Sequence, residues 1–180
     1  LVPVARPDSV PELIEMAAKI AGDRDGEIIA MRVVAIPDQL SPAALDGYIE
    51  SQRDILELAQ EHANRFDIPF TSLVMVGRRI ASSILETARA RNCGLILMGW
   101  KGYTNTADKI LGEVSDAVVK NARTDLMLVK LVGNKVPKKF LLPTAGGVHA
   151  LQAENYTSSL ARTDDTSITV ASVVLKGAGN

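Results

Sequence analysis

The chain has 180 residues, of which 47% are hydrophobic and only 4% aromatic, so aliphatic side chains must build its core. This composition favours an α/β protein with a buried parallel sheet over a β-sandwich. The formal net charge is −1 and no dense Lys/Arg block is present, which argues against nucleic acid as a partner. The single cysteine, Cys93, excludes an internal disulfide, and no apolar run approaches about 18 residues, so we expect a soluble domain in a reducing, cytoplasmic compartment.

In chain order, apolar strands alternate with amphipathic helices. Either Asp8 or Ser9 can cap a first helix that takes Pro11 into its first turn and ends at Gly22. We predict strands over residues 1–4, 27–35, 69–76, 94–98 and 126–131, and helices over 9–22, 42–65, 80–88 and 112–121. This alternation predicts right-handed crossovers and a doubly wound, five-stranded parallel sheet. In such a sheet, ligands lie at the carboxyl ends of the strands, where the strand order reverses.

The fourth predicted strand runs directly into a glycine-rich loop. Gly99, two residues, Gly102, nine residues and Gly112 follow one another before the next helical pattern begins. Glycines let a backbone approach an anion, and the free N–H groups and dipole of a helix N-terminus attract a phosphate. The same spacing also fits an ordinary turn from a strand to a helix.

An internal repeat begins after Gly133. Sliding the chain by 140 positions lays the segment that starts at Leu141 on the segment that starts at Leu1, and also aligns Ile168 with Ile28. We therefore predict a complete domain over 1–132, a linker over 133–137 and the strand, helix and strand of a partial second copy over 138–180. Because the chain begins with Leu1 rather than Met, we expect it to be a piece of a longer protein.

The glycine spacing, followed by Ser115, resembles the nucleotide-binding signature of the universal stress protein family. The resemblance extends over essentially the whole chain and implies the adenine nucleotide alpha hydrolase-like fold. The Gly99-Trp100-Lys101-Gly102 form of the motif and the tandem arrangement are similar to one subgroup. Domains of that subgroup form cytoplasmic tails of membrane transporters, notably cationic amino acid permeases and sodium/proton antiporters.

The resemblance implies where ATP or another adenine nucleotide, with Mg²⁺, would bind. The base would lie at the ends of the first two strands, and the ribose and phosphates along the glycine loop. The implied contact residues are Pro3, Val4, Ala5, Val33, Met98, Gly99, Lys101, Gly102, Gly112, Glu113, Val114 and Ser115. Two of them depart from the family pattern, because Ala5 replaces an Asp and Glu113 replaces a residue with a hydroxyl group.

The Glu113 carboxylate stabilises a helix N-terminus by roughly 0.3–1 kcal/mol, but beside a phosphate its sign is wrong. One such charge pair at about 4 Å costs on the order of 4 kcal/mol at an effective dielectric constant near 20, or roughly a thousandfold in affinity. Lys101, Arg78, Arg79 or a bridging Mg²⁺ could offset part of this cost. We expect a weak or blocked site that holds an adenine nucleotide poorly or not at all.

These features favour a regulatory module that senses a nucleotide and reports to an attached or associated transporter. The alternative is a ligand-free dimerisation and interaction module, since the apolar fifth strand should lie at a sheet edge and pair across a homodimer. No acid–base pair stands out, so we expect no enzyme beyond slow ATP hydrolysis. His62 and His149 lack the spacing of metal ligands, and no metal site is expected.

Overall fold

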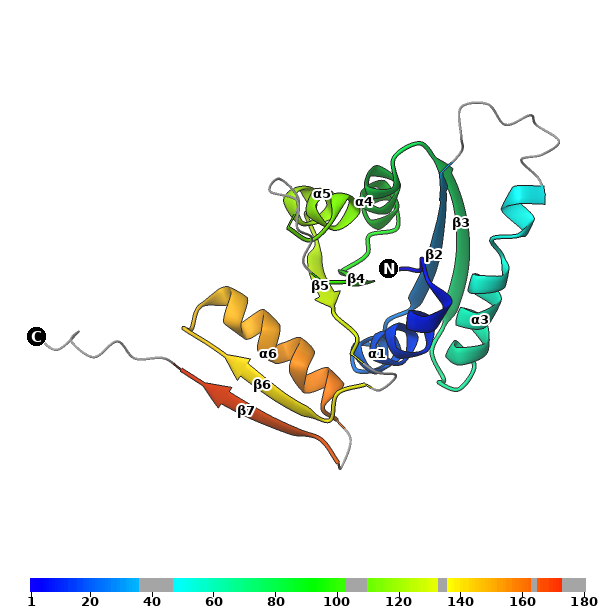
Figure 1. The fold of residues 1–180 in the computed structure, drawn as a ribbon. Helices are drawn as coiled ribbons and strands as arrows, with labels where there is room; N and C mark the ends of the chain where they lie inside the picture. Colours follow the sequence, from blue (N-terminus) through cyan, green and yellow to red (C-terminus); the bar gives the residue numbers. More distant parts are fainter. Residues whose placement is uncertain (36–46, 103–109, 133–135, 163–164, 173–180) are drawn as a thin grey trace, which may run out of the picture. The chain divides into compact units, whose positions relative to one another are not determined.

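A computed structural model describes residues 1–35, 47–102, 110–132, 136–162 and 165–172 (Figure 1). Contacts within the chain divide it into two compact units, Leu1–Lys135 (unit 1) and Val136–Asn180 (unit 2). The first three residues of the predicted linker, 133–135, lie outside the described residues, as does the part of the glycine loop over 103–109. The interpretation of unit 2 as a partial second copy stays a prediction.

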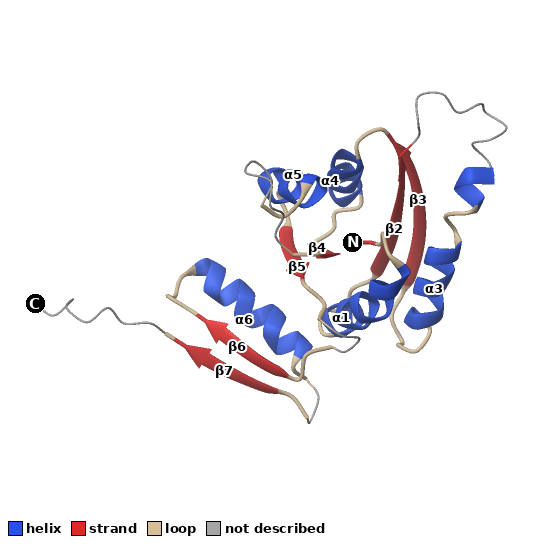
Figure 2. Cartoon of the chain, viewed as in Figure 1, coloured by secondary structure: helices blue, strands red, loops and turns tan. Residues whose placement is uncertain are grey.

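Unit 1 contains parallel strands, which confirms the predicted α/β class (Figure 2). A three-stranded sheet has the order β1-β2-β3, and β4 pairs with β5. The bounds of the strands are Val2–Pro3 for β1, Ile28–Ala35 for β2, Phe70–Gly77 for β3, Leu95–Gly99 for β4 and Asp125–Val129 for β5.

The two sheets of unit 1 meet at Leu1. The nitrogen of Leu1 donates a hydrogen bond to the Leu95 carbonyl at 2.8 Å, and the Leu97 N–H donates to the Leu1 carbonyl at 2.9 Å. Because β1 has only two residues, the hydrogen bonds between β1 and β4 involve Leu1 alone. The predicted single sheet is therefore two sheets joined at one residue. The contact brings the carboxyl ends of β1 and β4 next to each other, where the strand order reverses.

The helices of unit 1 are α1 (Val10–Gly22), α3 (Asp54–Ala63), α4 (Ile80–Ala90) and α5 (Glu113–Asn121). A 3-10 turn, η1 (Pro7–Ser9), leads into α1. Ser9 is the N-cap residue of α1, Pro11 lies in its first turn and the helix ends at Gly22, as the sequence predicts. The Ser9 hydroxyl donates to the Arg6 carbonyl at 2.9 Å and makes no capping hydrogen bond to α1.

The predicted single helix over 42–65 is wrong at 51–53. Residues 47–50 are helical, a turn follows, and α3 begins at Asp54, while the predicted start at residue 42 lies outside the described residues. Polar contacts of Ser51 and Gln52 explain the break. The Ser51 hydroxyl bonds to the Tyr48 carbonyl at 2.8 Å, and the Gln52 side chain is bound by Arg32.

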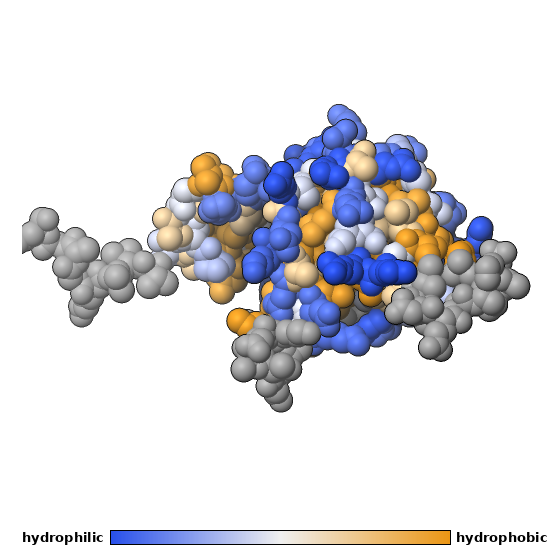
Figure 3. Space-filling view, turned by 90° about the horizontal axis from the view of Figure 1, so that it is seen from above, coloured by the Kyte–Doolittle hydropathy of each residue, from blue (hydrophilic) through white to orange (hydrophobic). Residues whose placement is uncertain are grey.

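Helices cover both faces of the strands of unit 1. On one face, a buried cluster joins β2, β4, α4 and α5, with Met31, Met98 and Val118 among its members. On the other face, α1 buries Leu13 and contacts β1, β2 and β4. Outside this core, Figure 3 shows hydrophobic areas (orange) interspersed with hydrophilic side chains (blue) on the viewed face.

Unit 2 is a strand–helix–strand element in which β6 (Lys139–Pro143) and β7 (Ser167–Ala171) pair in parallel and α6 (Val148–Leu160) connects them. Tyr156 and Leu160 of α6 are buried, but Leu141 and Val170 are 68% and 61% exposed. Apolar burial in unit 2 is therefore thin. In the part of the chain that the structure describes, no helix has the length and hydropathy needed to cross a bilayer.

Candidate functional site

A pocket of about 190 Å³ opens at the carboxyl ends of β1, β4 and β5 in unit 1. It lies where the order of the strands reverses, which is the usual ligand position in such sheets. Pro3, Ala5, Arg6, Ser9, Leu13, Gly99, Trp100, Lys101, Val129 and Leu131 line it. Four of the predicted contact residues, Pro3, Ala5, Gly99 and Lys101, therefore lie together in one pocket.

Four other predicted contact residues have their side chains in the core instead. Val4 and Met98 are buried, and Val33 and Val114 pack against the cluster that contains Met98. Successive residues of a strand point to opposite faces, so Met98 faces α4 and α5 while Gly99 faces α1. None of these four residues lines the pocket.

Two of the three motif glycines have backbone conformations that favour glycine. Gly102 has a φ of 111° and Gly112 has a φ of 98°, both in the left-handed half of conformational space. A Cβ atom on Gly102 would lie 3.5 Å from the Nζ atom of Lys130. Lys130 follows β5, so a cation lies directly against the glycine loop.

The N-terminus of α5, where a phosphate would bind, carries two carboxylates. Glu113 is the first residue of the helix and is exposed. Asp116 reaches back and accepts a hydrogen bond from the Leu111 N–H, at 3.1 and 3.3 Å to its two oxygens. Ser115, the predicted hydroxyl contact, is only 9% exposed. This helix end therefore carries negative charge of its own.

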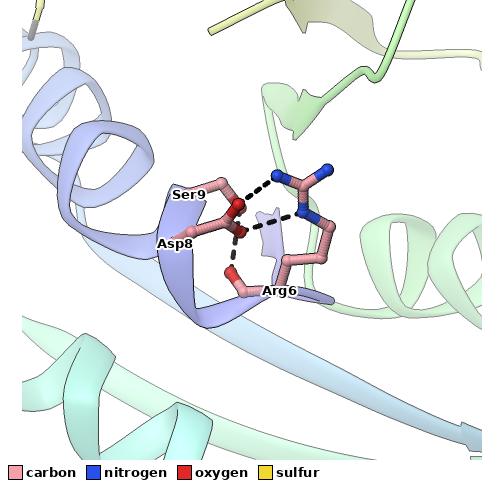
Figure 4. A network of polar contacts seen from close by, with 3 residues as sticks. All are labelled: Arg6, Asp8 and Ser9. Atoms are coloured by element: carbon pink, nitrogen blue, oxygen red, sulfur yellow. Dashed lines mark hydrogen bonds and ion pairs between the residues drawn. The ribbon is translucent and has the colours of Figure 1, made fainter. Parts of the chain in front are cut away.

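Arg6 and Asp8 form an ion pair beside the pocket (Figure 4). The Nε atom of Arg6 donates to Asp8 at 2.9 Å, and its Nη2 atom donates to the second carboxylate oxygen. The hydrogen bond from Arg6 holds the pKa of Asp8 below its usual value, and the charge of Lys101 adds a smaller effect in the same direction. Arg6 and Lys101 thus contribute two cations to the lining of the pocket, and the Asp8 carboxylate is paired with Arg6.

Arg32 of β2 ties the end of β1 to the turn before α3. One of its nitrogens donates to the Val4 and Ala5 carbonyls at 3.3 and 3.0 Å, and two others donate to the Gln52 side chain at 3.1 and 2.7 Å. The guanidinium group therefore orders the backbone at Ala5, where the family pattern has an Asp.

Several residues around the site were not among the predicted contact residues. Trp100 lines the pocket, and the Lys130 Nζ atom lies 5.9 Å from the centroid of its ring, within the range of a cation–π contact. The carboxyl ends of neighbouring parallel strands meet at one edge, so the position of Lys130 near the end of the fifth predicted strand was a usable signal. Arg32 and Asp116 gave no such signal, because their roles depend on where their side chains reach.

Other residues that the sequence analysis named are not among those that line the pocket. Arg78 and Arg79 are exposed, and Arg79 is the N-cap residue of α4. His62 lies in α3 of unit 1, and His149 lies in α6 of unit 2. Among the described residues, no group of three or more His, Cys, Asp or Glu side chains could hold a metal ion.

Comparison with known proteins identifies relatives of this chain. A sequence model of the universal stress protein family matches residues 1–130. The Na(+)/H(+) antiporter NhaS5 of Synechocystis sp. is 26% identical over 178 residues, which are 96% of this chain and 25% of the antiporter. A universal stress protein of Methanocaldococcus jannaschii is 26% identical over 137 residues, which are 72% of this chain and 80% of that protein. The chain therefore spans about a quarter of the antiporter's length.

Solved structures agree with these matches. The crystal structure of a universal stress protein from Archaeoglobus fulgidus matches this chain with a TM-score of 0.66 and 17% identity. The match covers 98% of this chain and 68% of the Archaeoglobus chain. A universal stress protein from Archaeoglobus fulgidus in complex with dAMP has a TM-score of 0.52 at 14% identity. Another universal stress protein, in complex with cAMP, has a TM-score of 0.50 at 20% identity. Each of these two matches covers 72% of this chain and 94% of the solved chain.

At these identities the structures show the fold alone, and they confirm the predicted fold class. The family match and the antiporter match confirm the resemblance that the glycine motif and the tandem arrangement indicate.

Proposed function

Because the chain belongs to the universal stress protein family, we propose that it is the regulatory domain of a membrane transporter, with a weakened site for an adenine nucleotide. The nucleotide would lie along the glycine loop, between the end of β4 and the start of α5. In this proposal the chain lies in the cytoplasm and reports the state of its site to the transporter.

Structural relatives support an adenine nucleotide as the ligand. The two solved structures in complex with cAMP and dAMP share the fold of this chain. The chain retains the glycine spacing and the two left-handed glycines, Gly102 and Gly112, that let the backbone approach a phosphate. Mg²⁺ would join the site through the phosphates, in the way that this cation usually binds.

The carboxylates of Glu113 and Asp116 at the N-terminus of α5 are the observation that carries the proposal of a weakened site. A phosphate at this helix end would approach both, and each repulsive pair opposes binding. Lys101 and Lys130 offset part of this repulsion. Lys101 precedes Gly102 in the sequence, and Lys130 lies beside Gly102 in space. The balance favours weak binding over a complete block.

Similarity to the antiporter supports the transporter as the partner. The match extends over nearly the whole chain, although the chain spans only a quarter of the antiporter. A domain of this kind would be attached to, or would associate with, a membrane-embedded transport unit. Nucleotide binding would then alter transport, since a ligand that binds one state more tightly shifts the equilibrium toward it.

Calorimetric titration with ATP and Mg²⁺ tests the site. Substitution Glu113→Ser restores a hydroxyl group at the start of α5 and should tighten ATP binding at least roughly tenfold, a fraction of the full repulsion because the side chain is exposed. The matched control is Asp54→Ser, which removes the same charge from the first position of another helix, α3. Its affinity should equal that of the parent chain.

Equal ATP affinities for the parent chain and Glu113→Ser would refute the weakened site. If neither protein binds ATP, Mg²⁺-ATP or AMP, the nucleotide proposal fails. Hydrolysis is expected to be slow or absent, and a phosphate-release assay with the Glu113→Ser variant would detect it.

A second candidate function is a ligand-free dimerisation and interaction module. In the described residues, β5 pairs only with β4, which leaves its other edge open to a partner strand. A homodimer through β5, together with no response to nucleotide, would favour this function. Light scattering with and without ATP separates the two candidates.

A further inference from the structure

We propose that a groove at the amino ends of β4 and β5 binds a dicarboxylate, in which a short aliphatic chain joins two carboxylate groups. The groove has a volume of about 540 Å³ and lies between the last turn of α4 and the end of α5. These two helices lie side by side in unit 1 (Figure 1). The inference does not depend on the proposed nucleotide function.

The groove is separate from the glycine loop. Cys93 and Thr124 line it and immediately precede β4 and β5, whereas the loop begins at Gly99, the last residue of β4. At about 3.3 Å for each residue step, the strand from Leu95 to Gly99 is about 13 Å long. None of the predicted nucleotide contacts lines the groove. A ligand here therefore binds at the opposite end of the strands.

Two arginines supply the positive groups of the groove. Arg89 lies in the last turn of α4, Arg123 lies between α5 and β5, and both are exposed. Within the part of the chain that the structure describes, no ion pair or side-chain hydrogen bond holds either guanidinium group. A guanidinium group pairs with a carboxylate through two parallel hydrogen bonds, so two arginines match two carboxylates.

The carbonyl groups at the ends of α4 and α5 are largely occupied, although a helix C-terminus carries partial negative charge. In α4, the Thr87 and Ala88 carbonyls accept hydrogen bonds at 2.9 and 2.8 Å from N–H groups that follow the helix. In α5, the Ala117 carbonyl accepts one at 2.7 Å from the Asn121 side chain. These internal bonds use carbonyl oxygens that would otherwise repel a carboxylate.

The charge around the groove is positive. Glu86 also lines the groove and offsets one of the two arginines. The charged chain neighbours of the lining residues are Arg91, Lys120 and Asp125. Close to Cys93, the Leu1 amino group and Glu27 act on each other, and burial lowers the pKa of this amino group. The excess of charge remains positive even when that amino group is neutral, and it attracts an anion.

The floor of the groove is apolar and favours an aliphatic chain over a compact inorganic anion. Ala88 and Ile96 line the groove but are only 3% and 0% exposed, so they lie at its base. The half-buried Leu85 adds a further aliphatic side chain. The volume lies within the roughly 300–1,000 Å³ that is typical of sites for small organic ligands. An inorganic phosphate would leave this apolar surface uncovered.

Cys93 gives the groove a chemical probe. It is the only cysteine of the chain, it lines the groove and it is partly exposed. Iodoacetamide, a small neutral reagent, alkylates the thiolate form of a cysteine. A ligand in the groove should slow this alkylation saturably, as measured by mass spectrometry of the intact chain.

Calorimetric titration with adipate measures the affinity directly. We expect a Kd on the order of 1 mM for a ligand this small. Hexanoate, which has the same chain length but one carboxylate fewer, should bind at least roughly tenfold more weakly. Inorganic phosphate, which has no aliphatic chain, should bind more weakly by a similar factor of about ten. Sodium chloride at equal ionic strength corrects for screening.

Variants test the two arginines. Arg89→Gln and Arg123→Gln should each weaken adipate binding roughly fivefold or more. The matched control is Arg91→Gln, which removes the same charge from an exposed neighbour that does not line the groove. Its affinity should fall less than about twofold, because only a screened long-range attraction is lost. Far-UV circular dichroism and thermal melting confirm that each variant is folded.

Four outcomes would overturn the proposal. These are no binding up to about 50 mM adipate, equal binding of adipate and hexanoate, binding that leaves Cys93 unprotected, or an equal loss of affinity in Arg91→Gln and the two groove variants. The Glu113→Ser variant should bind adipate as the parent chain does. Loss of ATP binding with intact adipate binding would refute only the proposed nucleotide function, and the reverse result would refute only the dicarboxylate groove.

Discussion

Gly112 holds a backbone conformation that is costly for any other residue, which leads to a quantitative prediction. Its φ is 98° and its ψ is 156°, and it is the N-cap residue of α5. Apart from its chain neighbours, no atom of the described residues lies within 4 Å of the place where a Cβ atom would be added, so a methyl group meets no obstacle among them. The cost of Gly112→Ala is therefore purely conformational, of order 1–3 kcal/mol.

The Gly112→Ala substitution should also weaken packing in the core of unit 1. Val118, three residues before the end of α5, is fully buried in the cluster with Met98. If α5 cannot start in its native conformation, that packing is weakened. At roughly 2–4 °C for each kcal/mol in a chain of this size, the melting temperature should fall by about 2–12 °C.

Gly94→Ala is the matched control. Gly94 also has nothing within 4 Å of an added Cβ atom, and its φ lies outside the left-handed region. Its melting temperature should stay the same or rise slightly, because alanine reduces the entropy of the unfolded chain. Both variants are measured by circular dichroism without nucleotide. Equal melting temperatures for Gly112→Ala and Gly94→Ala would refute the argument from conformation.

Further predictions concern polar contacts and unit 2. Substitution Arg32→Met removes hydrogen bonds to two carbonyls and an amide, and should destabilise unit 1 by about 2 kcal/mol in denaturant unfolding. The Asp8 carboxyl should titrate below its usual pKa by NMR, and Arg6→Gln should raise that pKa. Because folding lowers this pKa, the associated stability is present above the unfolded pKa and is lost as the pH falls through the folded pKa. Amides of β6 and β7 should exchange hydrogen faster than those of β2, because their apolar side chains are more exposed.

Local signals in the sequence were enough to predict most elements of unit 1. The Ser9 and Pro11 start of α1, its end at Gly22 and the β2 strand depend on short-range rules of capping and alternation. The glycine spacing likewise pointed to a loop that could approach a phosphate, and the structure gives Gly102 and Gly112 the left-handed conformations that such a loop uses. Each of these features depends on residues close in sequence.

The break at 51–53 shows where local reasoning ends. The apolar spacing on either side suggested one helix, but Arg32, about 20 residues earlier, binds Gln52. The same limit applies to the end of β1, where Arg32 takes the Val4 and Ala5 carbonyls. Such contacts between distant residues form only when the strands have paired in register, so no window of sequence contains them.

The tertiary structure also decided how the predicted contact residues are distributed. The sequence could state that neighbouring strand residues face opposite sides, but the packing of α1 against Gly99 and of α4 against Met98 determined which side is which. It brought Arg6, Lys101 and Trp100 to one pocket, and it laid Lys130 beside Gly102. A pocket is a space left between elements that are distant in sequence, so its size and charge exist only after those elements pack.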